Sequence, residues 1–106
     1  MAKPDSEPKT LCYTPTADKK PTRIPTWKYA AIRSAVLRVV PECPPGVAAK
    51  DLPGLVAQQL DAHTKQKIGS ISWHTTTVKL NMEVDGELLR LPKLKPQHLI
   101  RPPSAH

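Results

Sequence analysis

The pattern of apolar and polar residues predicts an amphipathic helix over residues 27–40. Its apolar side chains recur at helical spacing and share one face, whereas arginine and serine lie on the other face. Thr26 stands in the N-cap position, and Pro41 ends the helix because the residue before a proline is driven out of the helical region. The apolar face consists of Tyr29, Ile32, Val36, Val39 and Val40.

A second, shorter helix is predicted after a proline-rich connector at residues 42–50. Val47 is the single large apolar side chain of this connector, and a short extended segment would bury it. Asp51 is the expected N-cap of the helix, and Pro53 falls in its first turn, where a missing amide hydrogen costs nothing. The apolar stripe of this helix is Leu52, Leu55, Val56 and Leu60. The polar and basic residues 62–69 that follow are expected to form a loop.

The next segment fits two different elements. At helical spacing it carries two apolar stripes on nearly opposite sides, with Ser70 or Ser72 as N-cap and Gly86 where a helix commonly ends. The stripes are Ile71, Val78 and Met82, with Thr75 between them, and Trp73, Leu80 and Val84. Alternating apolar residues before an Asp-Gly pair are instead a signal for a strand and a hairpin. Periodicity alone therefore leaves helix and strand both open for residues 72–85.

Two short strands are predicted after Gly86. Residues 87–91 and 97–101 are extended in character, and the segment between them begins and ends with proline, which donates no ladder bond. The predicted order is therefore helix, short extended piece, helix, contested segment, strand and strand.

The first 25 residues are rich in proline, threonine and lysine, and we expect them to be a disordered basic tail. Their sizeable apolar side chains are Leu11, Tyr13 and Ile24, too few to offset the entropy of ordering the segment. The domain itself is therefore expected at residues 26–103. Local docking of Leu11 and Tyr13 onto an apolar strip at residues 73–80 is the alternative.

The net charge of +7 on 106 residues is concentrated in the second half of the chain. Residues 63–106 carry seven basic and three acidic side chains, compared with four and three in residues 27–62. Such an excess around the contested segment and the strand pair is typical of a nucleic-acid-binding protein. A net charge of this size also increases solubility, which is the alternative explanation.

The run from Gly69 to Gly86 has the form GS-x-S-W-x-T-T-T-V-K-L-x-x-E-x-x-G. This run resembles an uncharacterised bacterial family of short winged-helix-like proteins, and residues 26–102 resemble a winged helix-turn-helix domain in the order of their elements. The resemblance implies an α+β fold of three helices with a C-terminal β-hairpin wing. It also implies that the contested segment is a helix. The connection at residues 62–70 is longer than the turn of a standard helix-turn-helix.

The resemblance implies non-catalytic DNA binding, as in a transcriptional regulator, with double-stranded DNA as the partner. In such domains a recognition helix enters the major groove while other groups contact phosphates. The polar side of the contested helix and the basic wing would supply these groups, with Lys79 reaching a phosphate, Asn81 an adenine edge and the wing lysines straddling the backbone. The expected DNA-binding residues are Ser72, His74, Thr76, Lys79, Arg90, Lys93 and Lys95.

The alternative function is protein interaction without DNA binding, either in a homodimer or as an adaptor. Trp73, Leu80 and Val84 form one apolar strip at helical spacing, and aromatic residues carry much of the binding energy of protein interfaces. A contiguous apolar patch would favour this alternative, whereas a contiguous basic surface would favour DNA.

Neither an enzyme, a metal site nor a cofactor site is expected. Cys12 and Cys43 are isolated, the four histidines have no ligand spacing, and the four glycines form no phosphate-binding loop. No apolar run approaches the roughly 18 residues of a membrane span. The N-terminus lacks the apolar core of a signal peptide. The sequence therefore predicts a cytoplasmic protein with no membrane segment.

Overall fold

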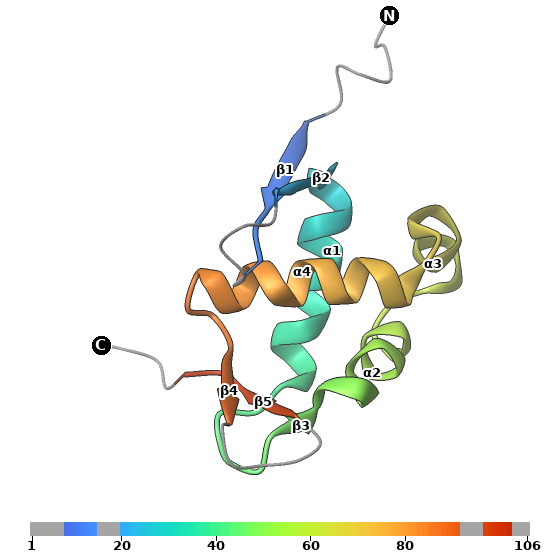
Figure 1. Cartoon of the computed structure of the whole chain (residues 1–106). Helices are drawn as coiled ribbons and strands as arrows, with labels where there is room; N and C mark the ends of the chain where they lie inside the picture. The colour runs from blue at the N-terminus through green and yellow to red at the C-terminus, as the bar shows by residue number, and fades with distance from the viewer. Residues whose placement is uncertain (1–7, 15–19, 92–96, 103–106) are drawn as a thin grey trace, which may run out of the picture.

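The computed structural model describes residues 8–14, 20–91 and 97–102, and this part of the chain forms four α-helices and two small antiparallel sheets (Figure 1). The predicted mixed α+β class is confirmed, but the helix count is four rather than three. The helices are α1 (Thr26–Val39), α2 (Leu52–Gln58), α3 (Ala62–Ile68) and α4 (Ile71–Val84), and one 3₁₀ turn, η2 (Ala49–Asp51), precedes α2. The strands are β1 (Lys9–Cys12), β2 (Thr22–Pro25), β3 (Val47–Ala48), β4 (Leu89–Leu91) and β5 (His98–Ile100).

Helix α1 has nearly the predicted bounds and the predicted buried face. Ile32, Val36 and Val40 are buried, and Tyr29 and Val39 pack partly buried against them. The predicted N-cap is wrong by one residue, because Thr26 is already helical and makes no capping bond. Its amide instead donates to Pro8 O at 2.9 Å, and its hydroxyl pairs with that of Thr10 at 2.9 Å.

The contested segment is helix α4. Its first turn is capped by Ser70, whose hydroxyl oxygen accepts from the Trp73 amide at 3.2 Å. Gly86 has φ +83° just after the helix ends, a backbone conformation that glycine adopts without strain. Of the two predicted stripes, one is buried at Thr75, Val78 and Met82, whereas Trp73 and Val84 of the other are exposed. Local caps at both ends therefore agree with the packing, and the strand alternative is wrong.

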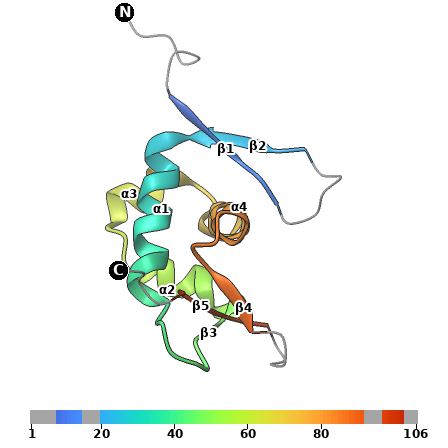
Figure 2. The same cartoon turned by 90° about the vertical axis from the view of Figure 1, so that its left-hand side faces the viewer.

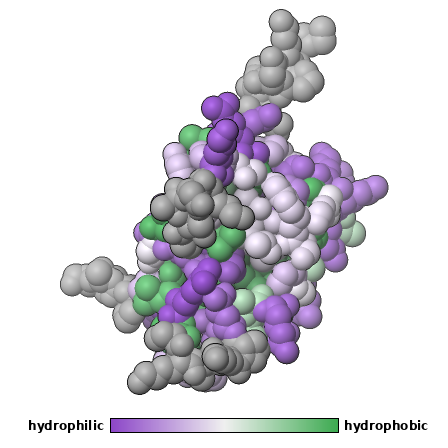
Figure 3. Space-filling view, viewed as in Figure 1, coloured by the Kyte–Doolittle hydropathy of each residue, from purple (hydrophilic) through white to green (hydrophobic). Residues whose placement is uncertain are grey.

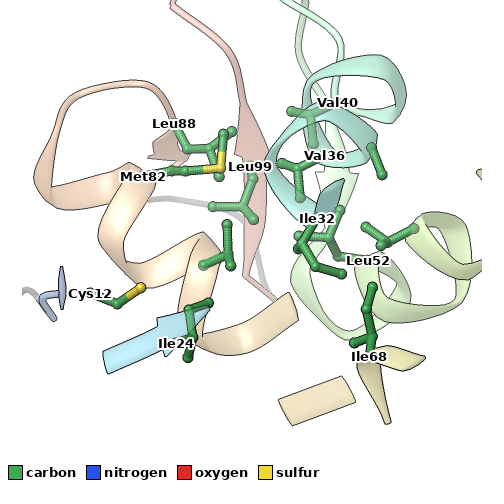
Figure 4. Close-up of a cluster of buried hydrophobic side chains, with 13 residues drawn as sticks. Cys12, Ile24, Ile32, Val36, Val40, Leu52, Ile68, Met82, Leu88 and Leu99 are labelled. Atoms are coloured by element: carbon green, nitrogen blue, oxygen red, sulfur yellow. The ribbon is translucent and has the colours of Figure 1, made fainter. Parts of the chain in front are cut away.

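The core lies between α1, α2 and α4 and extends to the sheet that contains β5 (Figure 4). Leu88, Met82 and Leu99 meet at one end, where the chain leaves α4 for the sheet, and Ile68 and Leu52 lie toward the other end. The buried cluster consists of Cys12, Ile24, Ile32, Ala35, Val36, Val40, Leu52, Val56, Ile68, Val78, Met82, Leu88 and Leu99. Aliphatic side chains fill the interior, as expected of a chain without phenylalanine.

Strands β3, β5 and β4 form one sheet in that order. The two predicted C-terminal strands pair with each other, with Arg90 opposite Leu99. The short extended segment expected at Val47 becomes a third strand, because Val47 pairs with Leu99 from the other side. Residues 92–96, between β4 and β5 in the sequence, lie outside the described residues.

The loop predicted at residues 62–69 is wrong, because most of it is helix α3. The Asp61 carboxylate accepts from the Thr64 amide at 2.7 Å and caps the helix, and Ile68 is buried at its other end. Asp51 occupies the N-cap position of α2 as predicted, although its side chain makes no capping hydrogen bond.

The predicted disordered tail is wrong for residues 8–14 and 20–25, which contain the antiparallel pair β1–β2. Cys12 and Ile24 point inward from this hairpin and are buried in the core. The Tyr13 amide also donates to Asn81 Oδ1 of α4 at 2.8 Å. Docking onto α4 was the alternative in the sequence analysis, but the anchors are the Cys12 side chain and the Tyr13 backbone, since the side chains of Leu11 and Tyr13 stay exposed.

Helix α4 lies between the two sheets on one side of α1 (Figure 2). Figure 2 shows α4 end-on, with β1 and β2 above it, β4 below it and α1 to its left. The side of α4 that faces away from α1 is not covered by any other labelled element in this view. This arrangement leaves one long face of α4 available to solvent.

Candidate nucleic-acid interface

The open face of α4 carries hydroxyl and apolar side chains and no charge at its exposed positions. Ser72 and Thr76 are exposed, and Trp73 and Val84 have 49% and 46% of their surface exposed to solvent. Leu80 lies between them and is half-buried. The predicted protein-interface strip and two of the predicted DNA contacts therefore share one surface.

The start of this face is held in place by local hydrogen bonds. His74 Nδ1 lies 2.7 Å from Ser70 O, and the His74 ring meets the Trp73 indole edge-on with 4.8 Å between centroids. The Thr77 hydroxyl donates to Trp73 O at 2.9 Å. The hydroxyls of Ser72 and Thr76 have no hydrogen-bond partner within the described part of the chain. His74 thus orients Trp73, while Ser72 and Thr76 are available to a ligand.

Lys79, the predicted phosphate contact on α4, is not available to a phosphate. It is only 8% exposed, and its Nζ lies 2.9 Å from Glu83 Oε2, one turn further along the helix. The other carboxylate oxygen of Glu83 accepts from Arg90 Nε of β4. One buried carboxylate therefore pairs with two of the predicted cations and joins α4 to the β4–β5 pair.

The remaining predicted cations belong to the β4–β5 hairpin. Arg90 is exposed on β4 apart from its bond to Glu83. Lys93 and Lys95 lie in residues 92–96, outside the described residues. The structure therefore brings Ser72, Trp73 and Thr76 together on α4 and ties Arg90 to the far end of the same helix.

A polar network that the sequence analysis missed joins the N-terminal hairpin, α1 and α4. Asn81, expected to reach an adenine edge, is instead buried, and its amide nitrogen donates to the Tyr29 hydroxyl at 2.7 Å and to Asp85 Oδ2 at 3.3 Å. Arg33 Nε donates to both Glu87 oxygens at 3.1 and 3.0 Å. These groups line an open pocket of about 590 Å³ below β1. No local sequence signal marks the network, since it joins segments that are more than 50 residues apart in the chain.

Burial and nearby carboxylates raise the pKa of Tyr29 in this network and of the nearby Cys12 thiol. Burial, with a smaller effect of the Asp85 carboxylate, raises the pKa of the Cys12 thiol to about 11. Burial also raises the pKa of the Tyr29 phenol, against the opposing effect of its hydrogen bond with Asn81. Both groups are therefore neutral at physiological pH, and the network acts as a structural brace.

The family model of a family of unknown function (DUF6958) matches residues 9–99. The chain belongs to this family. The DUF6958 match begins in β1 and ends in β5, so the family unit includes the N-terminal hairpin that the sequence analysis placed outside the domain. No curated protein matches the chain, and no solved structure does.

Across residues 8–14, 20–91 and 97–102, no group of three or more histidine, cysteine or acidic side chains is placed to hold a metal ion. None of the described helices combines the length and the apolar character needed to cross a membrane.

Proposed function

We propose that this DUF6958 protein is a winged-helix protein that binds duplex DNA through the open face of α4 and the β4–β5 hairpin. The order of elements supports the proposal, since a strand between the first two helices joins a C-terminal strand pair in the sheet order β3-β5-β4. The observation that carries it is the open face of α4. A helix buried on its other sides leaves uncharged donors and acceptors free along one side, as base readout in the major groove requires.

The proposed base contacts come from the first two turns of α4. Hydroxyls such as those of Ser72 and Thr76 can donate to or accept from either base of a pair, and apolar groups can contact the thymine methyl group. The Thr76 methyl group and the Trp73 indole would make the apolar contacts. Lys79 drops out of the proposed contacts because it is buried beside Glu83, whereas Arg90 is exposed. His74 acts by positioning Trp73.

The proposed phosphate contacts flank this neutral face. Arg90, Lys93 and Lys95 would contact the backbone from the hairpin, since phosphate contacts position a protein on DNA without reading sequence. At the other end, α3 supplies Lys65 and Lys67 beside the start of α4. In Figure 3 the pale surface over the middle of α4 lies next to strongly hydrophilic surface on the side of α3. Cations at both ends of a neutral helix fit a duplex lying along α4.

Fluorescence anisotropy with a labelled generic duplex at two salt concentrations tests the proposal. Lys93→Ala combined with Lys95→Ala should weaken binding and flatten the slope of log K against log salt by about one to two. Arg38→Ala combined with Lys50→Ala is the matched control, because it removes the same charge from exposed positions outside α4 and the β4–β5 hairpin. Equal losses in both double variants would mean non-specific attraction by net charge and would contradict the proposed interface.

Protein interaction is a second candidate function, favoured by the exposure of Trp73 and Val84 on one face of α4. Sedimentation equilibrium distinguishes the two candidates. A mass of twice 11.7 kDa that falls to the monomer value in Trp73→Ser would support self-association. A monomer at every concentration that binds duplex through Thr76 would support the DNA proposal.

A further inference from the structure

A second pocket lies between the start of α1 and helix α3, away from the open face of α4. It has a volume of about 430 Å³ and is lined by Trp27, His63, Thr64 and Lys67. Volumes of this order are typical of small-molecule sites. None of its lining residues belongs to α4 or to the β4–β5 hairpin, and only Lys67 is shared with the proposed phosphate contacts of α3.

The side chains of this pocket combine an aromatic surface with hydrogen-bond donors and a positive charge. Trp27 keeps 39% of its surface exposed. His63, Thr64 and Lys67 add a ring nitrogen, a hydroxyl and an ammonium group from α3. No carboxylate lines the pocket within the described residues. The carboxylate of Asp61 precedes α3 and is directed to the Thr64 amide at 2.7 Å.

The residues on either side of Trp27 make contacts with α3 and with the N-terminal hairpin. The neighbouring Lys28 Nζ donates to Ile68 O at 3.3 Å and lies 5.7 Å from the centroid of the Trp27 ring. The preceding residue, Thr26, is bonded through its amide and its hydroxyl to the N-terminal hairpin. The first turn of α1, which carries the indole, is therefore anchored from both sides, and the Lys28 ammonium lies over the ring.

We propose that this pocket binds a nucleotide, with the base stacked on Trp27 and the phosphate paired with Lys67. Every base has a π-face that can stack on an aromatic side chain. An ammonium group is a strong donor to phosphate oxygens. An inorganic anion alone would leave the indole unused, and a neutral aromatic ligand would leave the lysine unused. The nucleotide is either a free mononucleotide or a single-stranded nucleotide of a nucleic acid, and both present the same base and phosphate.

Titration of the Trp73→Phe variant with deoxyadenosine monophosphate tests the proposal, because Trp27 is then the only tryptophan. We expect saturable quenching of Trp27 emission, and weaker binding of adenosine and of inorganic phosphate. Lys67→Gln should weaken binding about tenfold or more, as expected for a hydrogen bond to a charged group. Lys65→Gln is the matched control, since it removes the same charge from the same helix but outside the pocket.

A second variant keeps the test independent of fluorescence. Trp27→Leu should weaken binding about 5- to 100-fold when followed through the NMR shift of the Thr64 amide, since stacking is lost. Quenching that rises linearly without saturation would overturn the proposal, because it reports collisions only. Equal weakening by Lys65→Gln and Lys67→Gln would also overturn it, since diffuse charge would then explain binding.

Two DNA probes distinguish the two sources of the nucleotide. A blunt duplex and the same duplex with a single-stranded overhang are compared by Trp27 quenching. Stronger quenching by the overhang assigns the site to a strand nucleotide, whereas quenching by the free monophosphate alone assigns it to a free nucleotide. Loss of duplex binding in the hairpin variant of Lys93 and Lys95 reports on α4 and the hairpin and leaves this pocket unaffected.

Discussion

Glu83→Gln should destabilise the fold by about 3 kcal/mol, although the side chain keeps its shape. The carboxylate of Glu83 is 6% exposed and the Lys79 side chain 10%, with 2.9 Å between the charged atoms. Removing one partner of a buried ion pair costs about 3–5 kcal/mol, because the other charge stays buried without compensation. Glu83 Oε2 has no hydrogen bond in the described residues, so the contact with Lys79 is Coulombic, and the lower end of this range applies.

This loss is large relative to the stability of the whole domain. The free energy of unfolding expected for a domain of 106 residues is about 5–15 kcal/mol. Urea denaturation followed by far-UV circular dichroism measures the change as a lower midpoint with an unchanged slope. Replacing both charges, with Glu83→Leu and Lys79→Met together, should restore most of the stability, because apolar pairs of similar volume often replace buried ion pairs without loss.

Glu87→Gln is the matched control for this prediction. It makes the same chemical change in an ion pair with Arg33, whose side chains are 28% and 41% exposed. Because solvent screens exposed pairs, the cost should be at most about 1 kcal/mol. If Glu83→Gln were no more destabilising than Glu87→Gln, burial of the Lys79 charge would not be what makes Glu83 important.

The remaining predictions concern two glycines and the two cysteines. Gly46→Ala should destabilise it by more than about 2 kcal/mol in the same urea assay, because φ is +70° and the new Cβ would lie 2.0 Å from a backbone oxygen of β5. Gly54→Ala, in open space on α2, should instead stabilise it by up to about 1 kcal/mol, and a loss at Gly54 would contradict the packing described. In a thiol-reagent assay at pH 8, the exposed Cys43 should react at once. Cys12 should react only after unfolding, because burial raises its pKa to about 11. Because the unfolded Cys12 thiol ionises at a lower pH than the folded one, the contribution of the protonated thiol to the free energy of unfolding is full below pH 9 and is lost as the pH rises towards 11. Fast reaction of both thiols in the native protein would contradict the burial of Cys12.

The elements that could be predicted from the sequence are those fixed by local signals. Pro41 ends α1, and Ser70 and Gly86 delimit α4, within one residue of the prediction. Helix α3 was missed because its polar sequence has no apolar stripe. It is held by the Asp61 cap and one buried side chain, Ile68.

The N-terminal hairpin could not be predicted because its stabilising contacts are distant in sequence. Cys12 packs into a core built from α1 and α4, and the Tyr13 amide bonds to Asn81, 68 residues away. An entropy estimate based on the first 25 residues alone cannot include these contacts. The role of Lys79 was predictable in part, since Glu83 stands four residues later on the same helix, a spacing that pairs opposite charges. The hydrogen bond from Arg90 to the Glu83 carboxylate could not be predicted from the sequence, because it depends on where β4 lies.

The most direct test of DNA binding by α4 is a backbone-amide NMR titration of the full chain with a generic duplex at low and moderate salt. We expect shifts at Ser72, Trp73 and Thr76 that fade as salt increases, with the Lys79 amide changing less than its neighbours. The absence of shifts on α4 at low salt would contradict DNA binding by this helix, as would shifts confined to Trp27 and α3.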